Sequence, residues 1–319
     1  IWHTAEGSTV SDRWGNRWID WSSGVLITNA GHGHPRICAA LQAYIERPLL
    51  ATYVFPHEGR AELIDALAQL APTPADYQVF LLTTGSEAVE NCIKLSKTYA
   101  LEKYGPHKKY IVSFQNAFHG RTMGAQLAGG MPRLKRWLGD SDTSFVQVPF
   151  PDGYKNENVS FDLFLATLDA LNVKPAEIAG VITESYQGVG PDFLPVAYAR
   201  ALEAFCREHD IVLTADEVQA GFGRTGKMFC YEHYGIAPDL IACGKGISSS
   251  LPLAAVIGRK CIMSLYPPGS MTSTHSASPL AVAAALASLA IVRDERLVER
   301  AARLGAWFIP ELHRIQAKY

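Results

Sequence analysis

The chain has 319 residues, of which 48% are hydrophobic, and its formal net charge is -2. A chain of this length buries a large core in one or two domains, and its charge excludes a basic field for nucleic acid or for an anionic membrane surface. The apolar runs, such as residues 281–292, are too short to span a bilayer. The six cysteines form no CxxC pair, which predicts buried thiols in a reducing cytoplasm.

The two ends of the chain have different patterns. Residues 9–21 predict a hairpin with a turn at residues 14–16. Residues 59–71 have the periodicity of an amphipathic helix, with Leu63, Leu67 and Leu70 on one stripe. From residue 279 to residue 319 the pattern is helical and rich in Ala and Leu.

In the middle of the chain, short apolar runs alternate with turns and helices. We predict strands at residues 79–82, 110–114, 145–148, 178–183 and 211–215, and helices at residues 87–101 and 195–209. Several runs are apolar at consecutive positions, which is typical of strands buried on both faces. This alternation predicts an α/β fold with a mostly parallel sheet.

The first chemical motif is TTGSEA at residues 83–88, which leaves a predicted strand and begins a helix. Thr84 and Glu87 have the spacing of a capping box. A helix start with Gly85 and Ser86 exposes backbone N–H groups and a hydroxyl, which together make a phosphate site. An ordinary capped helix is the competing interpretation, because such caps are common.

The second motif is ADEVQ at residues 215–219, which ends a predicted strand. Side chains alternate along a strand, so Asp216 and Val218 face the same side. Open α/β sheets bind ligands at the carboxyl ends of their parallel strands. Asp216 is therefore placed to meet a nitrogen of an aromatic cofactor whose ring rests on Val218. A solvated loop acid and a metal site are the alternatives, although Glu217 is the one further ligand that the neighbourhood supplies.

Two more motifs follow apolar runs of the sequence. Lys245 lies between two glycines, after the apolar residues 240–242. Glycines allow close approach, and a partly desolvated lysine has a lowered pKa and becomes a nucleophile for carbonyl groups. In the segment AFHGRT at residues 117–122, Phe118 is suited to stack on a planar ring and Arg121 to bind a carboxylate. A plain loop lysine and a surface turn are the respective alternatives.

The order and spacing of these motifs resemble the class III (ω-amino acid type) aminotransferases of the pyridoxal-phosphate fold type I superfamily. The most specific part is the run DEVQAGFGRTG at residues 216–226, with Lys245 downstream. The resemblance covers nearly the whole chain. Its other segments are NAGHGHP at 29–35, TTGSEAVE at 83–90, FHGRT at 118–122, ESYQG at 184–188 and the pair Pro238 and Asp239.

The resemblance implies pyridoxal phosphate as the cofactor and Lys245 as the lysine that binds it as a Schiff base and later carries the substrate proton. It implies that Asp216 pairs with the pyridine nitrogen and keeps it protonated, so that the ring serves as an electron sink. Together these roles imply transamination, in which an amino group moves from an amine or amino acid donor to a keto acid or aldehyde.

Further roles follow from the same resemblance. Gly85 and Ser86 are expected to bind the phosphate of the cofactor. Phe118 is expected to stack on one face of the pyridine ring and Val218 on the other. Gln219 is expected to donate a hydrogen bond to the phenolic oxygen.

Three residues concern the partner subunit and the substrate. Thr274 lies five residues before Pro279, where a threonine in the family reaches the phosphate of the neighbouring subunit, so the resemblance implies a homodimer with shared active sites. Arg121 matches a position that binds a substrate carboxylate. Glu184 matches a glutamate that pairs with a C-terminal arginine and so helps to accept both amine and dicarboxylate substrates.

The fold implied is a large domain at residues 51–276, with a mostly parallel mixed sheet flanked by helices. Residues 1–50 and 277–319 are expected to form the two parts of a small domain. Family members continue past the position of residue 319, so we expect the C-terminal part to be incomplete. The usual Glu-Pro-x-Gln is replaced by ESYQ at residues 184–187, and the usual Gly-Asn-Pro by residues 277–279. These departures weaken assignment to a named subfamily.

The motifs leave other functions open. An amino-acid racemase or epimerase and a decarboxylase-transaminase share the cofactor and the fold, and a non-catalytic protein of the same fold is a third hypothesis. They also do not distinguish among amine donors. His32 and His34 invite a zinc site, but no third ligand of suitable spacing is near. The resemblance makes this segment a structural turn, and we expect no metal.

Overall fold

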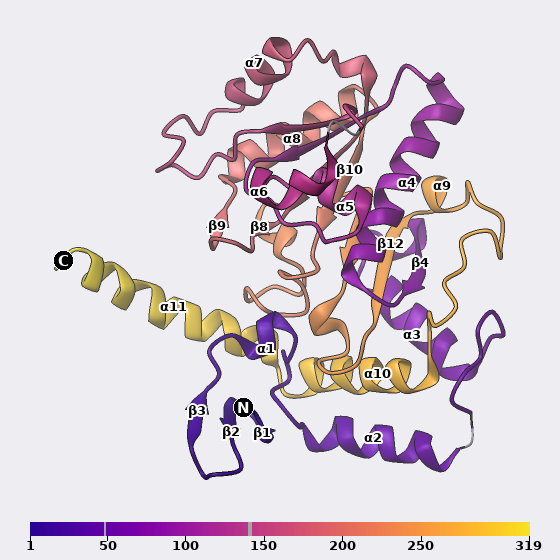
Figure 1. Cartoon of the computed structure of the whole chain (residues 1–319), viewed down its shortest axis with the longest axis vertical. Coiled ribbons are helices and arrows are strands. Elements are labelled where there is room, and N and C mark those ends of the chain that lie inside the picture. Colours follow the sequence, from indigo (N-terminus) through magenta and orange to yellow (C-terminus); the bar gives the residue numbers. More distant parts are fainter. Residues whose placement is uncertain (48, 140–141) are drawn as a thin grey trace.

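The computed structural model describes residues 1–47, 49–139 and 142–319 (Figure 1). Its centre is a seven-stranded sheet in the order β4-β12-β11-β10-β7-β5-β6. These strands are β4 (Tyr77–Leu82), β5 (Tyr110–Phe114), β6 (Phe145–Val148), β7 (Ile178–Glu184), β10 (Val212–Asp216), β11 (Leu240–Cys243) and β12 (Ala254–Arg259). The five strands predicted from apolar runs are confirmed as β4, β5, β6, β7 and β10.

The sheet is mixed because of β12. This strand is antiparallel to both of its neighbours, β11 and β4. The pairs formed among β11, β10, β7, β5 and β6 are all parallel. The parallel strands therefore bring their carboxyl ends to one edge of the sheet, where ligands bind in open α/β folds.

Helices cover both faces of the sheet (Figure 1). One face is covered by α4 (Gly85–Tyr104) and α5 (Met123–Ala128), and the other by α3 (Glu58–Ala68), α7 (Asp162–Ala170), α8 (Val196–Glu208) and α10 (Pro279–Asp294). Shorter helices are α1 (Ser23–Leu26), α6 (Pro132–Lys135) and α9 (Lys260–Met263). The helices predicted at residues 59–71, 87–101 and 195–209 are confirmed as α3, α4 and α8.

The two faces of the sheet have separate apolar cores. In β10, Leu213 and Ala215 join the cluster beneath α3, α7, α8 and α10, whereas Val212 joins the cluster beneath α4 and α5. This alternation follows from the two-residue period of a strand. Because both faces are buried, consecutive residues are apolar, as the sequence pattern predicts.

The N-terminal residues form a separate three-stranded sheet of β1 (Thr4–Glu6), β2 (Thr9–Ser11) and β3 (Arg17–Ile19). The predicted hairpin is confirmed by the antiparallel pairing of β2 with β3. Its turn is held by Asp12, which accepts hydrogen bonds from the backbone N–H groups of Trp14 and Asn16. Two further antiparallel strands, β8 (Tyr186–Gln187) and β9 (Asp192–Phe193), follow β7.

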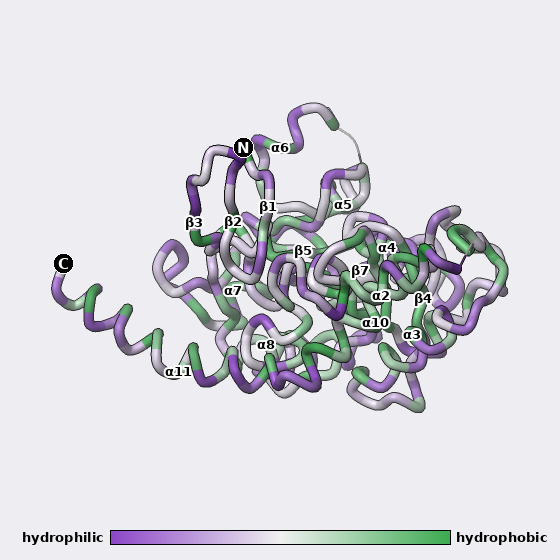
Figure 2. Tube along the Cα trace, turned by 90° about the horizontal axis from the view of Figure 1, so that it is seen from below, coloured by the Kyte–Doolittle hydropathy of each residue, from purple (hydrophilic) through white to green (hydrophobic). Residues whose placement is uncertain are grey.

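The C-terminal part is helical, as predicted, but it is divided into α10 and α11 (Leu297–Gln316). The helix breaks at Arg296, whose φ of 52° lies in the left-handed region. Helix α10 packs against α2 (Pro35–Glu46) and α3, while α11 extends away from the body of the molecule (Figures 1 and 2).

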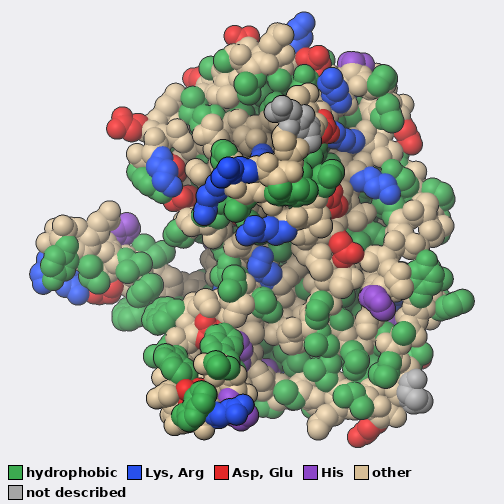
Figure 3. Space-filling model, in the orientation of Figure 1, with side chains coloured by type: hydrophobic (Ala, Val, Ile, Leu, Met, Phe, Trp, Pro, Cys, Tyr) green, Lys and Arg blue, Asp and Glu red, His purple; other side chains and the backbone are tan. Residues whose placement is uncertain are grey.

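Apolar side chains cover part of α11 where it leaves the body (Figure 3). One contact joins it to the N-terminal segment, since the ring of Phe308 stacks on that of Trp21 with centroids 6.2 Å apart. No helix among the described residues is both long enough and apolar enough to cross a membrane.

Candidate active site

A cavity of about 150 Å³ lies at the carboxyl edge of the parallel strands. Its walls come from the segments that follow β4, β5, β10 and β11. The lining residues are Thr84, Gly85, Ser86, Phe118, His119, Gly120, Asp216, Val218, Gln219 and Lys245. The fold thus brings together seven of the residues predicted from the motifs, although they are far apart in the sequence.

The start of α4 forms one wall of the cavity. Thr84 caps this 20-residue helix, since its side chain accepts a hydrogen bond from the N–H of Glu87 at 3.2 Å. The Glu87 carboxylate accepts in return from the N–H groups of Thr83 and Thr84, each at 2.9 Å. Glu87 therefore satisfies donors outside the helix, and the N–H groups of the first turn are left to face an anion.

The absence of side chains at two glycines keeps this wall open. A Cβ at Gly85 would lie 2.6 Å from Cγ1 of Val218, and one at Gly120 would lie 2.4 Å from Oγ of Ser86. Gly120 also has a φ of 139°, which side chains disfavour. The Ser86 hydroxyl accepts a hydrogen bond from the N–H of Arg121 at 3.2 Å, so the segments after β4 and β5 are joined at this point.

The Asp216 carboxylate is fixed at the opposite wall. Its Oδ2 lies 2.8 Å from Nδ1 of His119, and its Oδ1 accepts from the N–H of Val218 at 3.0 Å. Burial alone lowers the pKa of His119, but the hydrogen bond and charge of Asp216 outweigh it, so the pKa of the imidazole is raised. The imidazole of His119 thus lies against the Asp216 carboxylate inside the fold. Nε2 of His119 is buried and has no hydrogen-bond partner among the described residues.

Lys245 closes the cavity on the β11 side. Burial lowers the pKa of its ammonium group, while the negative charges of Asp216 and Glu184 oppose this effect. A lowered pKa makes the neutral, nucleophilic amine more accessible. Lys245 has a φ of 41°, in the left-handed region, directly after Gly244. A Cβ at Gly244 would lie 3.1 Å from Cγ1 of Val218, so this glycine permits the strand end to approach the cavity wall.

Glu184 lies just behind the lining. It ends β7 beside Asp216, which is its register partner on β10. Its carboxylate accepts hydrogen bonds from the N–H groups of Phe118 at 2.9 Å and Gly188 at 3.0 Å. Burial raises its pKa to about 7, with His119 opposing and Asp216 adding to the rise. This carboxyl group can therefore gain or lose a proton near neutral pH.

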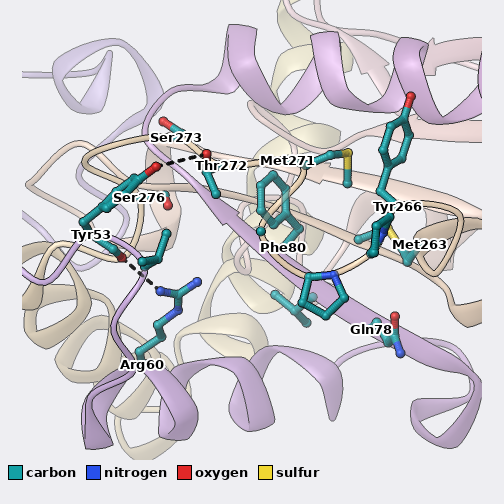
Figure 4. Close-up of a pocket in the computed structure, with 15 residues that line it drawn as sticks. Tyr53, Arg60, Gln78, Phe80, Met263, Tyr266, Met271, Thr272, Ser273 and Ser276 are labelled. Carbon is teal, nitrogen blue, oxygen red and sulfur yellow. Dashed lines mark hydrogen bonds between the residues drawn. The ribbon is translucent and has the colours of Figure 1, made fainter.

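Two further predicted residues, Arg121 and Thr274, also lie outside the lining. Arg121 is exposed, and its guanidinium carbon lies 5.4 Å from the centroid of the Phe118 ring. Thr274 is also exposed. Its neighbours Ser273 and Ser276 line a different cavity of about 320 Å³ beside β4 and α3 (Figure 4). The structure therefore does not bring Thr274 to the cavity that holds Lys245 in its own chain.

Sequence reasoning assigned no role to His119 or Glu217. His119 lies in the FHGRT segment next to Phe118, and its partner Asp216 is 97 positions away in the chain. The available signal was a histidine placed directly after a strand that ends at the site. Glu217 follows Asp216 but faces away from the cavity, where it is fully buried.

The two histidines of the NAGHGHP segment have structural partners. Nε2 of His32 lies 2.7 Å from Oδ2 of Asp20. His34 caps α2 by accepting a hydrogen bond from the N–H of Arg36, and its Nε2 faces Glu295 at 3.1 Å. The two rings thus have different carboxylate partners. Within residues 1–47, 49–139 and 142–319, no three His, Cys, Asp or Glu side chains are grouped to hold a metal ion.

The cavity fits pyridoxal phosphate by its chemistry. It has a partly desolvated lysine for an aldehyde, a histidine-supported carboxylate for a pyridine nitrogen and a helix N-terminus with a glycine for a phosphate. These donors and the mixed sheet define a pyridoxal-phosphate enzyme of fold type I.

Comparisons with known proteins agree with this class. The sequence model of the family Aminotransferase class-III matches residues 1–319. The chain is 35% identical to a 5-aminovalerate aminotransferase of Pseudomonas putida, over 99% of this chain and 74% of that protein. It is 33% identical to an acetylornithine/succinyldiaminopimelate aminotransferase of Yersinia pestis, over 98% of this chain and 74% of that protein.

Solved structures show the same fold. An (S)-enantioselective omega-transaminase from Thermomicrobium roseum superposes with a TM-score of 0.92 at 31% identity, covering 99% of this chain and 74% of that one. An ornithine aminotransferase from Toxoplasma gondii, described with pyridoxal phosphate at its active site, has a TM-score of 0.87 at 29% identity and covers 98% of this chain and 72% of that one.

The chain belongs to the class III aminotransferase family. It is a pyridoxal-phosphate-dependent aminotransferase and moves an amino group from an amine or amino acid donor to a keto acid or aldehyde.

Proposed function

We propose that Lys245 is the catalytic lysine, which binds the cofactor aldehyde as a Schiff base and afterwards moves the substrate proton. The observation that carries this proposal is the convergence of Lys245, Asp216 and the start of α4 on one cavity. Lys245 is the one lysine among the described lining residues. Burial lowers the pKa of its amine, so Nζ can attack a carbonyl carbon and can afterwards take up a proton.

Asp216 is proposed as the partner of the pyridine nitrogen. The bound cofactor supplies an electron sink that acidifies the substrate carbon. Asp216 keeps the ring nitrogen protonated through its negative charge. His119 holds the Asp216 carboxylate in place from behind, at 2.8 Å. The side chains of His119 and Asp216 are both buried, and a charge is more effective in such surroundings than in water.

The remaining cofactor contacts are proposed from their places in the cavity. Gly85 and Ser86 bind the phosphate at the start of α4. Phe118 and Val218, which both line the cavity, would contact opposite faces of the ring and so orient the substrate bond that breaks. Gln219, which packs against Gly188, is proposed to hydrogen-bond the phenolic oxygen.

Arg121 and Glu184 are proposed as substrate-binding residues. Arg121 is exposed beside Phe118, so its guanidinium is available to a carboxylate. The Glu184 carboxylate accepts a hydrogen bond from the N–H of Phe118, the residue proposed to stack on the ring. Its pKa of about 7 allows it to change charge when a ligand binds.

The proposed assembly is a homodimer in which Thr274 binds the phosphate of the neighbouring subunit. Thr274 lies outside the cavity of its own chain and is exposed, which agrees with a role in the partner. We propose a cytoplasmic location because all six cysteines are free. We also propose that residues 51–276 form the large domain and that residues 1–50 and 277–319 belong to the small domain, since α2 packs on α10.

Reduction of the purified protein with borohydride tests the role of Lys245. The protein with pyridoxal phosphate should absorb in the visible, and reduction should fix the cofactor to the peptide that contains Lys245, as read by mass spectrometry. Lys245→Ala should lower transamination at least about 10³-fold because the covalent and proton-transfer roles are both lost, while noncovalent cofactor binding remains.

Lys135 provides the matched control. It is half-buried and hydrogen-bonds to the Leu127 carbonyl at 2.7 Å, and burial lowers its pKa to about 8. Unlike Lys245, it does not line the cavity. Two outcomes would refute Lys245 as the catalytic lysine. One is cofactor fixed by borohydride to Lys135 and not to Lys245, and the other is full turnover by Lys245→Ala.

A further inference from the structure

A second buried carboxylate adjoins the cofactor site without lining it. Glu217 follows Asp216 and has an exposed fraction of 0%. It accepts three hydrogen bonds, from the hydroxyl of Ser185 at 2.5 Å and from the N–H groups of Cys230 and Tyr231, each at 2.9 Å. Burial raises the pKa of Glu217 to about 7, and the three hydrogen-bond donors oppose this rise.

Ser185 supplies the one side-chain donor in this set. It is 2% exposed and lies between Glu184 and β8. Its carbonyl oxygen accepts a hydrogen bond from the hydroxyl of Tyr234. Ser185 is therefore held through both its hydroxyl and its carbonyl. A proline, the usual residue of the family at this place, would have no hydroxyl for Glu217.

The segment that Ser185 holds supplies one of the two hydrogen-bond donors to the Glu184 carboxylate. The Glu184 carboxylate receives the N–H of Phe118 from the segment after β5 and the N–H of Gly188 from its own segment. On the other side of Ser185, Glu217 continues β10 directly after Asp216. The bond from Ser185 to Glu217 therefore ties the end of β7 to the end of β10 at the edge where the cavity lies.

We propose that Ser185 and Glu217 are positioning residues that hold the Glu184 carboxylate, and with it the backbone at Phe118 and Gly188, in register with the strand that carries Asp216. The proposal rests on the substrate-binding role proposed for Glu184. Asp216 has contacts of its own, to Nδ1 of His119 and to the N–H of Val218. Loss of the anchor should therefore change substrate binding more than the bond-breaking step.

Amide hydrogen exchange in the holoenzyme tests the anchor directly. Ser185→Ala should speed exchange of the amides of Phe118 and Gly188 by about tenfold, because these amides donate to Glu184 and the hydrogen bond that joins their segment to the buried Glu217 side chain is lost. The matched control is Ser113→Ala. Ser113 is a buried hydroxyl on the neighbouring strand β5 that donates to the Ala128 carbonyl at 2.6 Å.

Kinetics supply the second readout. Ser185→Ala should raise KM for substrate about tenfold while kcat changes by less than about threefold. Ser185→Thr should restore both exchange and KM, because it keeps the hydroxyl and a small cavity beside Ser185 has room for a methyl group. If the alanine variant does not fold, Ser185→Cys gives the same test with a weak donor of similar size.

The outcomes separate this proposal from the proposed function. Exchange and KM in Ser185→Ala that match those in Ser113→Ala would overturn the positioning role. Faster exchange with an unchanged KM would support the anchor and would refute the substrate role of Glu184. Borohydride label absent from Lys245 would refute the proposed function of that lysine, and the exchange measurement would still decide the anchor.

Discussion

Asp216 and Glu184 are neighbouring buried carboxylates with different partners. They are register partners on β10 and β7. Asp216 has the ring of His119 at 2.8 Å, whereas Glu184 accepts hydrogen bonds only from backbone N–H groups among the described residues. Burial therefore dominates at Glu184 and raises its pKa to about 7. Ionisation of Glu184 therefore destabilises the fold. In the folded protein, Glu184 keeps its proton below a pH of about 7.

This difference predicts a pH-dependent stability for Glu184→Gln. The folded-state pKa of Glu184, about 7, lies above its ordinary value of 4.5. Protonated Glu184 thus makes its full contribution to the free energy of unfolding below pH 4.5. This contribution is lost as the pH rises to about 7. Relative to the native protein, Glu184→Gln should gain roughly 3 kcal/mol in free energy of unfolding between these limits.

Urea unfolding of both proteins at a series of pH values measures this gain. Exposed Glu208 provides the control, since Glu208→Gln removes a carboxylate that the fold does not bury. A constant difference between Glu184→Gln and the native protein across pH 4.5 to 8 would contradict the prediction.

At the residue scale, the sequence predicted which side chains reach the cavity better than it predicted what they contact. Seven predicted residues line it because each follows a strand whose end lies at the same edge. The pairing of His119 with Asp216 was not predicted, because it depends on how the segment after β5 turns over β10. The anchor at Glu217 was missed for the same reason, since its donors come from two segments that are far apart in the sequence.

At the scale of elements, α4 is positioned by its close approach to the end of β10. Gly85, in the first turn of α4, has the side chain of Val218 against the place where its Cβ would be. The helix can therefore bring its N-terminal N–H groups to the cavity only if residue 85 has no side chain. Val218 itself is proposed to contact the ring of the cofactor. A side chain at position 85 would therefore also disturb the position of Val218.

Gly85→Ala should accordingly lower the affinity for pyridoxal phosphate by at least about tenfold. The new Cβ would lie 2.6 Å from Cγ1 of Val218, so either the helix start or Val218 must move. Titration of the apoprotein with the cofactor, followed by absorbance, measures the change.

Gly305→Ala is the matched control for this substitution. A Cβ at Gly305, in α11, would meet nothing within 4 Å. Alanine there should stabilise the helix by about 1 kcal/mol and leave cofactor affinity unchanged. Equal affinities in the two variants would show that the space at Gly85 is not needed.

The helices and strands were largely predictable from the sequence, but which strands pair, and in which direction, was not. Apolar runs and helical periodicity identified five strands and three helices at nearly the observed bounds. Strand β12 was not predicted, although residues 254–258 are buried and mostly apolar. A local pattern carries no information on strand direction. The antiparallel course of β12 is set by its pairing with β4 and β11.

At the scale of the whole molecule, the proposed dimer makes each cofactor site depend on two chains. Ser273, next to Thr274, donates a hydrogen bond to Glu87 at 3.1 Å, and Glu87 is the residue that caps the phosphate-binding turn. The loop that carries Thr274 is thus fastened to the start of α4 in its own subunit.

Mixed dimers test this arrangement. Thr274→Ala alone should weaken cofactor binding by about tenfold, through loss of one hydrogen bond to a charged phosphate. Combining Thr274→Ala subunits with Lys245→Ala subunits should restore one site of native affinity and activity, since one chain supplies Lys245 and the other Thr274.

The same mixture decides whether Thr274 acts across the interface. If Thr274 served its own subunit, no site in the mixed dimer would contain both residues, and neither affinity nor activity would recover. Mixing Thr274→Ala subunits with chains that carry both substitutions is the control, because no complete site can form in that mixture.

The position of β4 at the edge of the sheet also bears on how the chain is made. Its pairing partner is β12, with Leu82 opposite Ala254 and Tyr77 opposite Arg259. On the ribosome, β4 therefore emerges long before the strand that covers it. Such a nonlocal pairing delays folding and leaves an apolar strand open to aggregation in the meantime. Recovery of soluble protein should accordingly depend on translation rate and chaperone supply more than on the final stability of the fold.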